Sequence, residues 1–238
     1  MEQLPGAGSN REYYRMTGGD GTSVVGCIGT SRDENHAFVY LARHFAKRQL
    51  PVPQILAVSS DELRYLQTDL GAMSLFDAVR GGREAGGRYT LKEQELLKRT
   101  IRQLPNVQIR GARELDFTNC YPQPAFDTDS VLFDLNFIDF QGGRRGPYYY
   151  DVASFIWQAS AKYPHKVRRE LVYEYYNALK QYTEVPAPHA FVDRLSLFVL
   201  FRLLQVLGAY GFRGYFERKQ HFIDSIPPAI QNLREVLA

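Results

Sequence analysis

The sequence predicts an α+β fold in which a small antiparallel sheet with one helix precedes a larger, mainly helical part. Turn-separated β-type runs fill the first 68 residues, one amphipathic helical pattern interrupts them, and helical patterns dominate from residue 71 onward. At 238 residues the chain can form one large domain or two lobes. We predict an N-terminal lobe over residues 1–70 and a helical C-terminal lobe over residues 71–238.

The N-terminal lobe is expected to open with a β-hairpin. An aromatic run and a β-branched run flank the glycine-rich turn 18–21. Ser31 or Asp33 can then cap a helix with apolar residues on one face, and Pro51-Val52-Pro53 stops it. The expected elements are strands at 11–16 and 22–28, a helix over about 31–48, and strands at 54–58 and 63–68.

The C-terminal lobe is expected to begin after the turn-like Asp69-Leu70-Gly71. Thr90 and Glu93 form a capping box that opens one of its helices. The expected helices are at 74–79, 90–104, 150–162, 166–182, 189–210 and 215–223, with a last one from about 228. Residues 105–130, which are rich in proline and turn residues, are expected to be irregular.

Composition narrows the class of protein. The apolar fraction of 45% and the charged fraction of 23% are those of an ordinary globular protein. Two cysteines make no disulfide framework, and a net charge of +3 on scattered basic residues argues against nucleic-acid binding. The longest apolar run, near residues 195–204, contains Ser196 and Arg202, and the N-terminus has no signal-peptide pattern. We therefore expect no membrane contact and a cytoplasmic location.

Two aspartates are candidates for a functional site. Asp139 ends the apolar Phe137-Ile138 and leads into Gly142-Gly143 and Arg144-Arg145. A carboxylate in an apolar strand is costly unless it is paired or binds a cation, and Mg²⁺ prefers such oxygen ligands. The alternative is that Asp139 only starts a turn. Asp151 precedes an apolar helical run, where capping the helix is its expected role.

The chain from the first glycines to the Tyr150-Asp151-Val152-Ala153 motif resembles the aminoglycoside phosphotransferase/choline kinase family. The motifs are the glycine-rich 4–11, the helix before Leu50-Pro51-Val52-Pro53, the hinge-like 66–71, Ile138-Asp139-Phe140-Gln141 and Gly146-Pro147. Within that family it is most similar to bacterial N-acetylmuramate/N-acetylglucosamine anomeric sugar kinases. The resemblance implies a two-lobed, protein-kinase-like fold, ATP and Mg²⁺ as cofactors, and a small, sugar-like substrate.

The resemblance also implies roles for individual residues. Asp139 would bind the magnesium, Asp151 would brace the catalytic site, and residues of the hinge would lie at the adenine. The residues expected to bind the nucleotide are Gly6, Gly8, Ser9, Asn10, Arg11, Gln67 and Asp69. Kinases carry a lysine on the third strand that pairs with a helix glutamate, but residues 23–28 contain no lysine and Glu34 has no obvious strand partner. Arg11, Arg15 or Arg32 is expected to supply the charge, unless these arginines are plain surface groups.

The family's catalytic loop is missing from its expected place. That loop reads His/Tyr-x-Asp, with an Asn four residues later, a dozen or so residues before the metal aspartate. Residues 127–136 do not give this spacing, so several dozen residues are expected to be absent between Asn136 and Phe137, and the catalytic base is unknown. An omitted stretch of sequence, a real deletion and a pseudokinase are all open explanations. A real deletion would expose part of the helical lobe's core.

The sequence thus favours an ATP- and magnesium-dependent phosphotransferase acting on a small-molecule hydroxyl, of a sugar or amino sugar, without its catalytic-base loop. One alternative is a catalytically inactive nucleotide-binding pseudokinase or scaffold. Another is an unrelated helical binding module. The acceptor substrate and the oligomeric state are not predicted.

Overall fold

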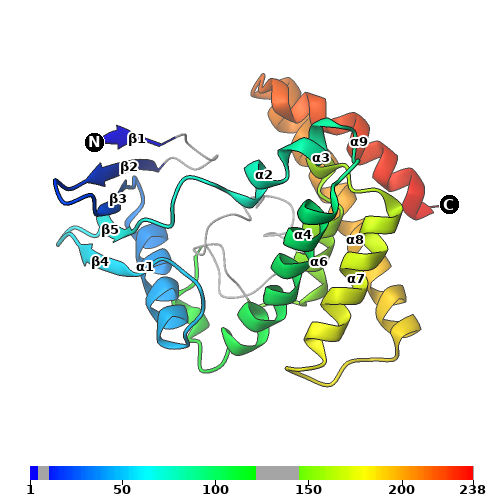
Figure 1. Ribbon diagram of the computed structural model, residues 1–238, viewed down its shortest axis with the longest axis horizontal. Helices are drawn as coiled ribbons and strands as arrows, with labels where there is room; N and C mark the ends of the chain where they lie inside the picture. The colour runs from blue at the N-terminus through cyan, green and yellow to red at the C-terminus, as the bar shows by residue number, and fades with distance from the viewer. Residues whose placement is uncertain (5–10, 122–144, 238) are drawn as a thin grey trace. The chain divides into compact units, whose positions relative to one another are not determined.

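The computed structural model describes residues 1–4, 11–121 and 145–237. Five strands come first along the chain, with one long helix between the third and fourth, and helices follow (Figure 1). The predicted α+β arrangement, a small antiparallel sheet with one helix and then a mainly helical part, is confirmed. By their internal contacts, residues 1–72 and 111–146 form one compact unit, and residues 73–110 and 147–238 form a second.

The sheet of the first unit has the strand order β1-β2-β3-β5-β4, and every neighbouring pair is antiparallel. Its strands are β1 (Glu2–Gln3), β2 (Glu12–Thr17), β3 (Ser23–Ile28), β4 (Ile55–Val58) and β5 (Arg64–Thr68). β2 and β3 form the predicted hairpin, whose turn contains Gly21 at a φ of +82°, a conformation that favours glycine.

Helix α1 (Arg32–Lys47) packs on one face of this sheet through its apolar side. Ser31 caps it by accepting a hydrogen bond from the amide of Glu34, as one of the two predicted caps would. Phe38 stacks on Tyr65 of β5, with ring centroids 5.0 Å apart, and Cys27 of β3 belongs to the same buried cluster. This contact fixes which sheet face the helix covers.

The chain from Gly111 to Cys120 packs on a second side of α1, next to the side that faces the sheet. Leu41, Phe45 and Leu50 form a buried cluster with Cys120, and the buried His44 donates from Nε2 to the carbonyl of Gly111 at 2.9 Å. A 3-10 turn, η2 (Phe117–Asn119), lies in this segment. The first unit therefore contains a piece of chain that the sequence assigned to the helical lobe.

Acid is expected to destabilise the first unit through the buried His44. Burial lowers the pKa of the His44 imidazole, so the stability it contributes is complete above pH about 6.5 and is lost as pH falls through the folded-state pKa. His44→Gln keeps a donor for the carbonyl but cannot become charged. Its acid-unfolding midpoint, followed by circular dichroism from pH 7 to 4, should lie below that of the wild type. Coincident curves would show that His44 does not limit acid stability.

The second unit is built from helices around one apolar core. The longer ones are α4 (Leu91–Pro105), α6 (Tyr149–Ile156), α7 (His165–Leu179), α8 (Pro188–Gly211) and α9 (Gln220–Leu237); the short ones are α2 (Leu75–Ala78) and α3 (Arg80–Glu84). Single turns occur at η1 (Asn106–Arg110), η4 (Ala159–Ala161) and η5 (Phe212–Phe216). The capping box at Thr90 and Glu93 is confirmed. Leu97, Ile156 and Leu171 are among the fully buried core residues.

The predicted break between two C-terminal helices is wrong. A single helix, α9, runs through Pro227 and Pro228. Proline removes a hydrogen bond from the interior of a helix, but side-chain contacts with neighbouring elements stabilise α9. Asn232 is buried and donates to the carbonyl of Trp157, and it accepts a hydrogen bond from Arg168 of α7. These tertiary contacts outweigh the local signal for a helix end.

The α8 helix bears on the expectation that no segment spans a membrane, which stays a prediction. In the described part of the chain, Pro188–Phe216 is long and apolar enough to cross a bilayer by length and composition. One side of α8, however, lies in the core of the second unit, where Leu195, Val199 and Leu203 are buried. A core helix of a globular unit passes the same test of composition.

Candidate functional site

One face of the N-terminal sheet carries three of the polar groups that the sequence singled out, Arg11, Arg15 and Gln67. Side chains of a strand alternate between faces, and the paired residues Tyr13, Cys27 and Tyr65 lie in a row on the face that α1 covers. The next row on this face, Arg15, Val25 and Gln67, follows toward the end of β5. Arg11 lies two residues before Tyr13, so by the same alternation it belongs to this face. The side chains of Arg11, Arg15 and Gln67 therefore border the part of the sheet that α1 covers.

Arg11 forms an ion pair with Glu34 of α1. Its Nη2 donates to Glu34 Oε1 at 2.9 Å, and its Nη1 donates to the Tyr13 hydroxyl at 3.3 Å. The Arg11 side chain is only 1% exposed, and its guanidinium lies 5.4 Å from the centre of the Phe38 ring. The expectation that Glu34 has no strand partner is therefore wrong: the partner is an arginine just before β2.

Arg15 is held by a different carboxylate. Its Nε and Nη2 donate to the two oxygens of Asp69 at 2.6 and 3.1 Å. The Ser23 hydroxyl and the Gly71 amide donate to the same carboxylate at 2.8 and 2.9 Å. The hydrogen bonds from Arg15, then Gly71, then Ser23 hold the pKa of Asp69 well below its usual range. Asp69 thus ties β2 and β3 to the chain after β5.

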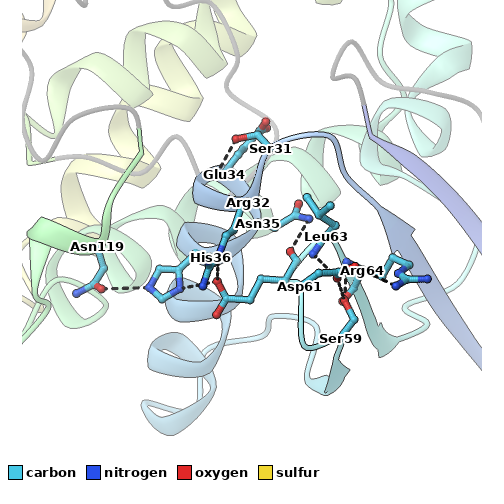
Figure 2. A network of polar contacts seen from close by, with 11 residues as sticks. Ser31, Arg32, Glu34, Asn35, His36, Ser59, Asp61, Leu63, Arg64 and Asn119 are labelled. Carbon is cyan, nitrogen blue, oxygen red and sulfur yellow. Dashed lines mark hydrogen bonds and ion pairs between the residues drawn. The ribbon is translucent and has the colours of Figure 1, made fainter.

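The third arginine, Arg32, belongs to the surface network in Figure 2. Its Nε donates to Glu62 at 3.0 Å, and its side chain is 68% exposed. His36 lies between Glu62 and Asn119. Asn35 donates to the carbonyl of Glu62, which joins α1 to the turn between β4 and β5. Arg32 has a structural partner at the surface, and Arg11 is the most buried of the three arginines.

Gln67 has a buried side-chain oxygen without a hydrogen-bond partner. The atom is Oε1, and the residue pairs with Val25 of β3 and Ile55 of β4. A buried polar group is normally hydrogen-bonded, and leaving it unpaired costs about 1–3 kcal/mol. An orphaned acceptor of this kind is a place where a donor from a ligand would be stabilising.

Asp151 does not cap its helix, contrary to expectation. Helix α6 begins at Tyr149, and Tyr148 at the cap position makes no side-chain cap. The Asp151 carboxylate instead accepts a hydrogen bond from Nε2 of Gln108 at 2.7 Å, and Gln108 Oε1 accepts one from the Tyr175 hydroxyl at 2.6 Å. Burial raises the pKa of Asp151, and the Gln108 contact opposes that rise. Nothing in the sequence pattern singled out Gln108.

Several expected site residues lie outside the described residues. These are Gly6, Gly8, Ser9, Asn10 and Asp139, together with the join between Asn136 and Phe137. Arg145 is described, and its guanidinium lies 4.7 Å from the centre of the Phe117 ring. Within residues 1–4, 11–121 and 145–237, no three His, Cys, Asp or Glu side chains are grouped as a metal site.

One comparison with known proteins, a search of curated sequences, agrees with the resemblance seen in the sequence. No family model matches the chain. The chain is 21% identical over 276 aligned positions to N-acetylmuramate/N-acetylglucosamine kinase of Pseudomonas aeruginosa, covering 97% of this chain and 81% of that protein. A crystal structure of a thermostable mutant of an aminoglycoside phosphotransferase, in its apo form, matches with a TM-score of 0.49 and 16% identity, covering 98% of this chain and 93% of that one. The chain is thus similar over nearly its whole length to a curated sugar kinase.

Proposed function

We propose that this chain is an ATP- and magnesium-dependent phosphotransferase of the cytoplasm, which acts on a hydroxyl of a sugar or amino sugar. The observation that carries the proposal is the buried pair of Arg11 and Glu34. Kinases use a strand cation paired with a carboxylate of the helix packed on the sheet to bind the phosphates of ATP. Arginine suits this task because its guanidinium matches phosphate oxygens.

The residues present fit a nucleotide in two further respects. Arg11 directly follows the glycine-rich residues 5–10, whose backbone amides would approach the phosphates. The orphaned Oε1 of Gln67 would accept a hydrogen bond from an exocyclic amine such as that of adenine. Asp69 would support the nucleotide site without contacting the nucleotide, because its carboxylate oxygens already accept hydrogen bonds from Arg15, Ser23 and Gly71. Asp139 would bind the magnesium, and Asp151 would give structural support to the site.

The curated relative supports the substrate class, since it is a kinase named for two amino sugars. The length of the alignment with this relative is also relevant to the missing catalytic loop. The 276 aligned positions exceed the 238 residues of this chain, so the relative has residues at aligned positions where this chain has none. A segment absent between Asn136 and Phe137 would account for such positions, and its absence would favour a second candidate function, an inactive nucleotide-binding protein.

Calorimetry with Mg-ATP tests the binding part of the proposal. The wild type should bind, and Asp139→Ala should bind severalfold more weakly, because magnesium loses a carboxylate ligand. Equal affinities would remove the metal role of Asp139, and the absence of any binding would reject both candidate functions.

A product assay separates the two candidates. N-acetylglucosamine and N-acetylmuramate, each incubated with Mg-ATP and the wild-type chain, should yield sugar phosphate if the chain transfers phosphoryl groups. Binding without product for either sugar would favour the inactive protein.

A further inference from the structure

A cavity of about 1060 Å³ lies in the second unit, between α7 and α8. Residues of α4, of α9 and of the chain after α6 complete its walls. Tyr173 of α7 and Val192 of α8 line it and are 66% and 47% exposed, so a ligand can enter from solvent. Small-molecule sites in proteins have volumes of about 300–1,000 Å³. Of the described residues that the proposed function uses, none lines this cavity.

Much of the lining is apolar and belongs to the core of the second unit. Phe191, Leu195 and Val199 follow one side of α8 at intervals of four residues and are at most 2% exposed. Val236 of α9 and Trp157 after α6 pack against the same core. The apolar body of a ligand would leave water on binding to this surface, which is favourable.

Basic residues gather where α7 begins. His165, Lys166 and Arg169 lie within the first five residues of this helix, and all three line the cavity. The positive end of a helix dipole is usually offset by acidic residues or by a capping side chain. The first turn of α7 contains no acidic residue, and Pro164 at the cap position makes no side-chain hydrogen bond. An anion would therefore be stabilised at this end of the cavity.

The acidic residues of the lining do not neutralise this end, because each already has a basic partner at 2.7 Å. The pairs are Glu170 with Lys98, Glu174 with Arg102, and Glu235 with Arg168. Lysine and arginine outnumber carboxylates in the lining by four to three. Within the described part of the chain, Lys166 and Arg169 form no ion pair. The pKa of Glu170 is lowered mainly by Lys98, and Lys166 adds to this only at longer range.

Arg168 is a buried charge in the wall of the cavity. Its side chain is only 8% exposed, and its Nη1 donates to Glu235 at 2.7 Å. Its Nε has no hydrogen-bond partner among the described residues. Burial lowers the pKa of this guanidinium, and Glu235 offsets that effect only in part. Further negative charge nearby would therefore stabilise the buried cation.

We propose that this cavity binds one fatty carboxylate, with its chain on the apolar lining and its head group at the basic start of α7. The apolar lining requires a ligand with a hydrocarbon body, and the excess of basic side chains requires an anionic head. Arginine matches the geometry of a carboxylate. An alcohol of the same chain length would gain nothing from the basic end, and a cationic amphiphile would be repelled by it.

Fluorescence of Trp157 tests this proposal on the full chain. Trp157 is the only tryptophan of the sequence and lines the cavity, so its emission reports on this site. Micromolar dodecanoate, well below micelle formation, should shift the emission to shorter wavelength in a saturable manner, with one molecule bound per chain. Dodecanol and dodecyltrimethylammonium should bind about tenfold more weakly, the value of one charge-assisted hydrogen bond.

A charge reversal at the rim tests the position of the head group. Lys166→Glu should weaken dodecanoate binding about three- to tenfold, because an attraction becomes a repulsion, and should leave dodecanol binding unchanged. It should not harm folding, since an acidic residue suits the first turn of a helix. Lys92→Glu is the matched control, because Lys92 is likewise the exposed second residue of a 15-residue helix but lies outside the lining. It should bind dodecanoate as the wild type does.

Filling the cavity tests the position of the chain. Ser196 lines the cavity from an exposed position of α8, so Ser196→Phe should abolish binding of dodecanoate. Ser225→Phe is the control, because both serine hydroxyls donate to the carbonyl four residues earlier and Ser225 lies outside the lining.

The absence of a saturable change in Trp157 emission would overturn the proposal. So would equal affinities for dodecanoate and dodecanol, or a folded Ser196→Phe protein that binds as Ser225→Phe does. If Ser196→Phe does not fold, the comparison of Lys166→Glu with Lys92→Glu decides, and equal affinities there would reject the anionic site. None of these readouts involves nucleotide, so failure here leaves the proposed function unaffected.

Discussion

Arg11→Leu is expected to lower the affinity for Mg-ATP about 10- to 100-fold, the value of one charge-assisted contact with a phosphate. The substitution removes the guanidinium that pairs with Glu34 and leaves that carboxylate, 23% exposed, without this partner. Arg11→Lys keeps a positive charge but loses the fork geometry, so it should retain part of the affinity. Calorimetric titration of each variant with Mg-ATP gives the ranking.

A matched control separates this effect from a general loss of basic charge. Arg32→Leu removes an arginine whose partner, Glu62, is at the surface. Its affinity for Mg-ATP should equal that of the wild type. Thermal unfolding without nucleotide shows whether Arg11→Leu acts through the fold, because breaking a buried ion pair also destabilises. If Arg11→Leu remains folded and binds Mg-ATP as the wild type does, Arg11 is not the phosphate-binding cation.

The sequence predicted the N-terminal sheet well because its signals are local. Alternation within strands, the glycine turn and the cap of α1 each depend on residues that are close along the chain. The partner of Glu34 depends on how β2 lies beside α1, and Arg11 and Glu34 are 23 residues apart. The propensity of short segments contains no information on such a pairing. Three arginines were therefore equally good candidates until their partners were known.

The errors in the helical part have the same cause. The local signal of Pro227-Pro228 predicted a helix boundary, but the buried Asn232 holds α9 against α7. Asp151 resembled a helix cap by its position, and its actual partner, Gln108, is 43 residues away. In each case a distant partner decided the local structure.

The network of Gln108, Asp151 and Tyr175 should make Gln108→Leu strongly destabilising, by roughly 3 kcal/mol. Nε2 of Gln108 donates to Asp151, and its Oε1 accepts from Tyr175, which is fully buried. Leucine would leave the carboxylate and the hydroxyl unpartnered, at about 1–3 kcal/mol for each group. Urea unfolding at pH 7 measures the loss. Gln103→Leu, at an exposed position of α4, is the matched control and should change stability by less than about 0.5 kcal/mol.

The pH dependence shows whether the buried charge causes this loss. Burial raises the pKa of Asp151, so the folded state holds the proton more tightly than the unfolded state. The ionised carboxylate therefore lowers stability as pH rises from about 3.9 through the folded-state pKa. Asp151→Asn removes that penalty and should be at least as stable as the wild type at pH 7.

The double variant Gln108→Leu, Asp151→Asn should recover part of the stability that Gln108→Leu loses, because no charge is left stranded. The loss in Gln108→Leu alone should grow between pH 4 and pH 7. A loss that is the same at both values, with no recovery in the double variant, would mean that the packing of Gln108 holds this part of the helical unit together. A stable Asp151→Asn protein that has lost phosphoryl transfer would identify Asp151 as a charge kept for function at a cost in stability.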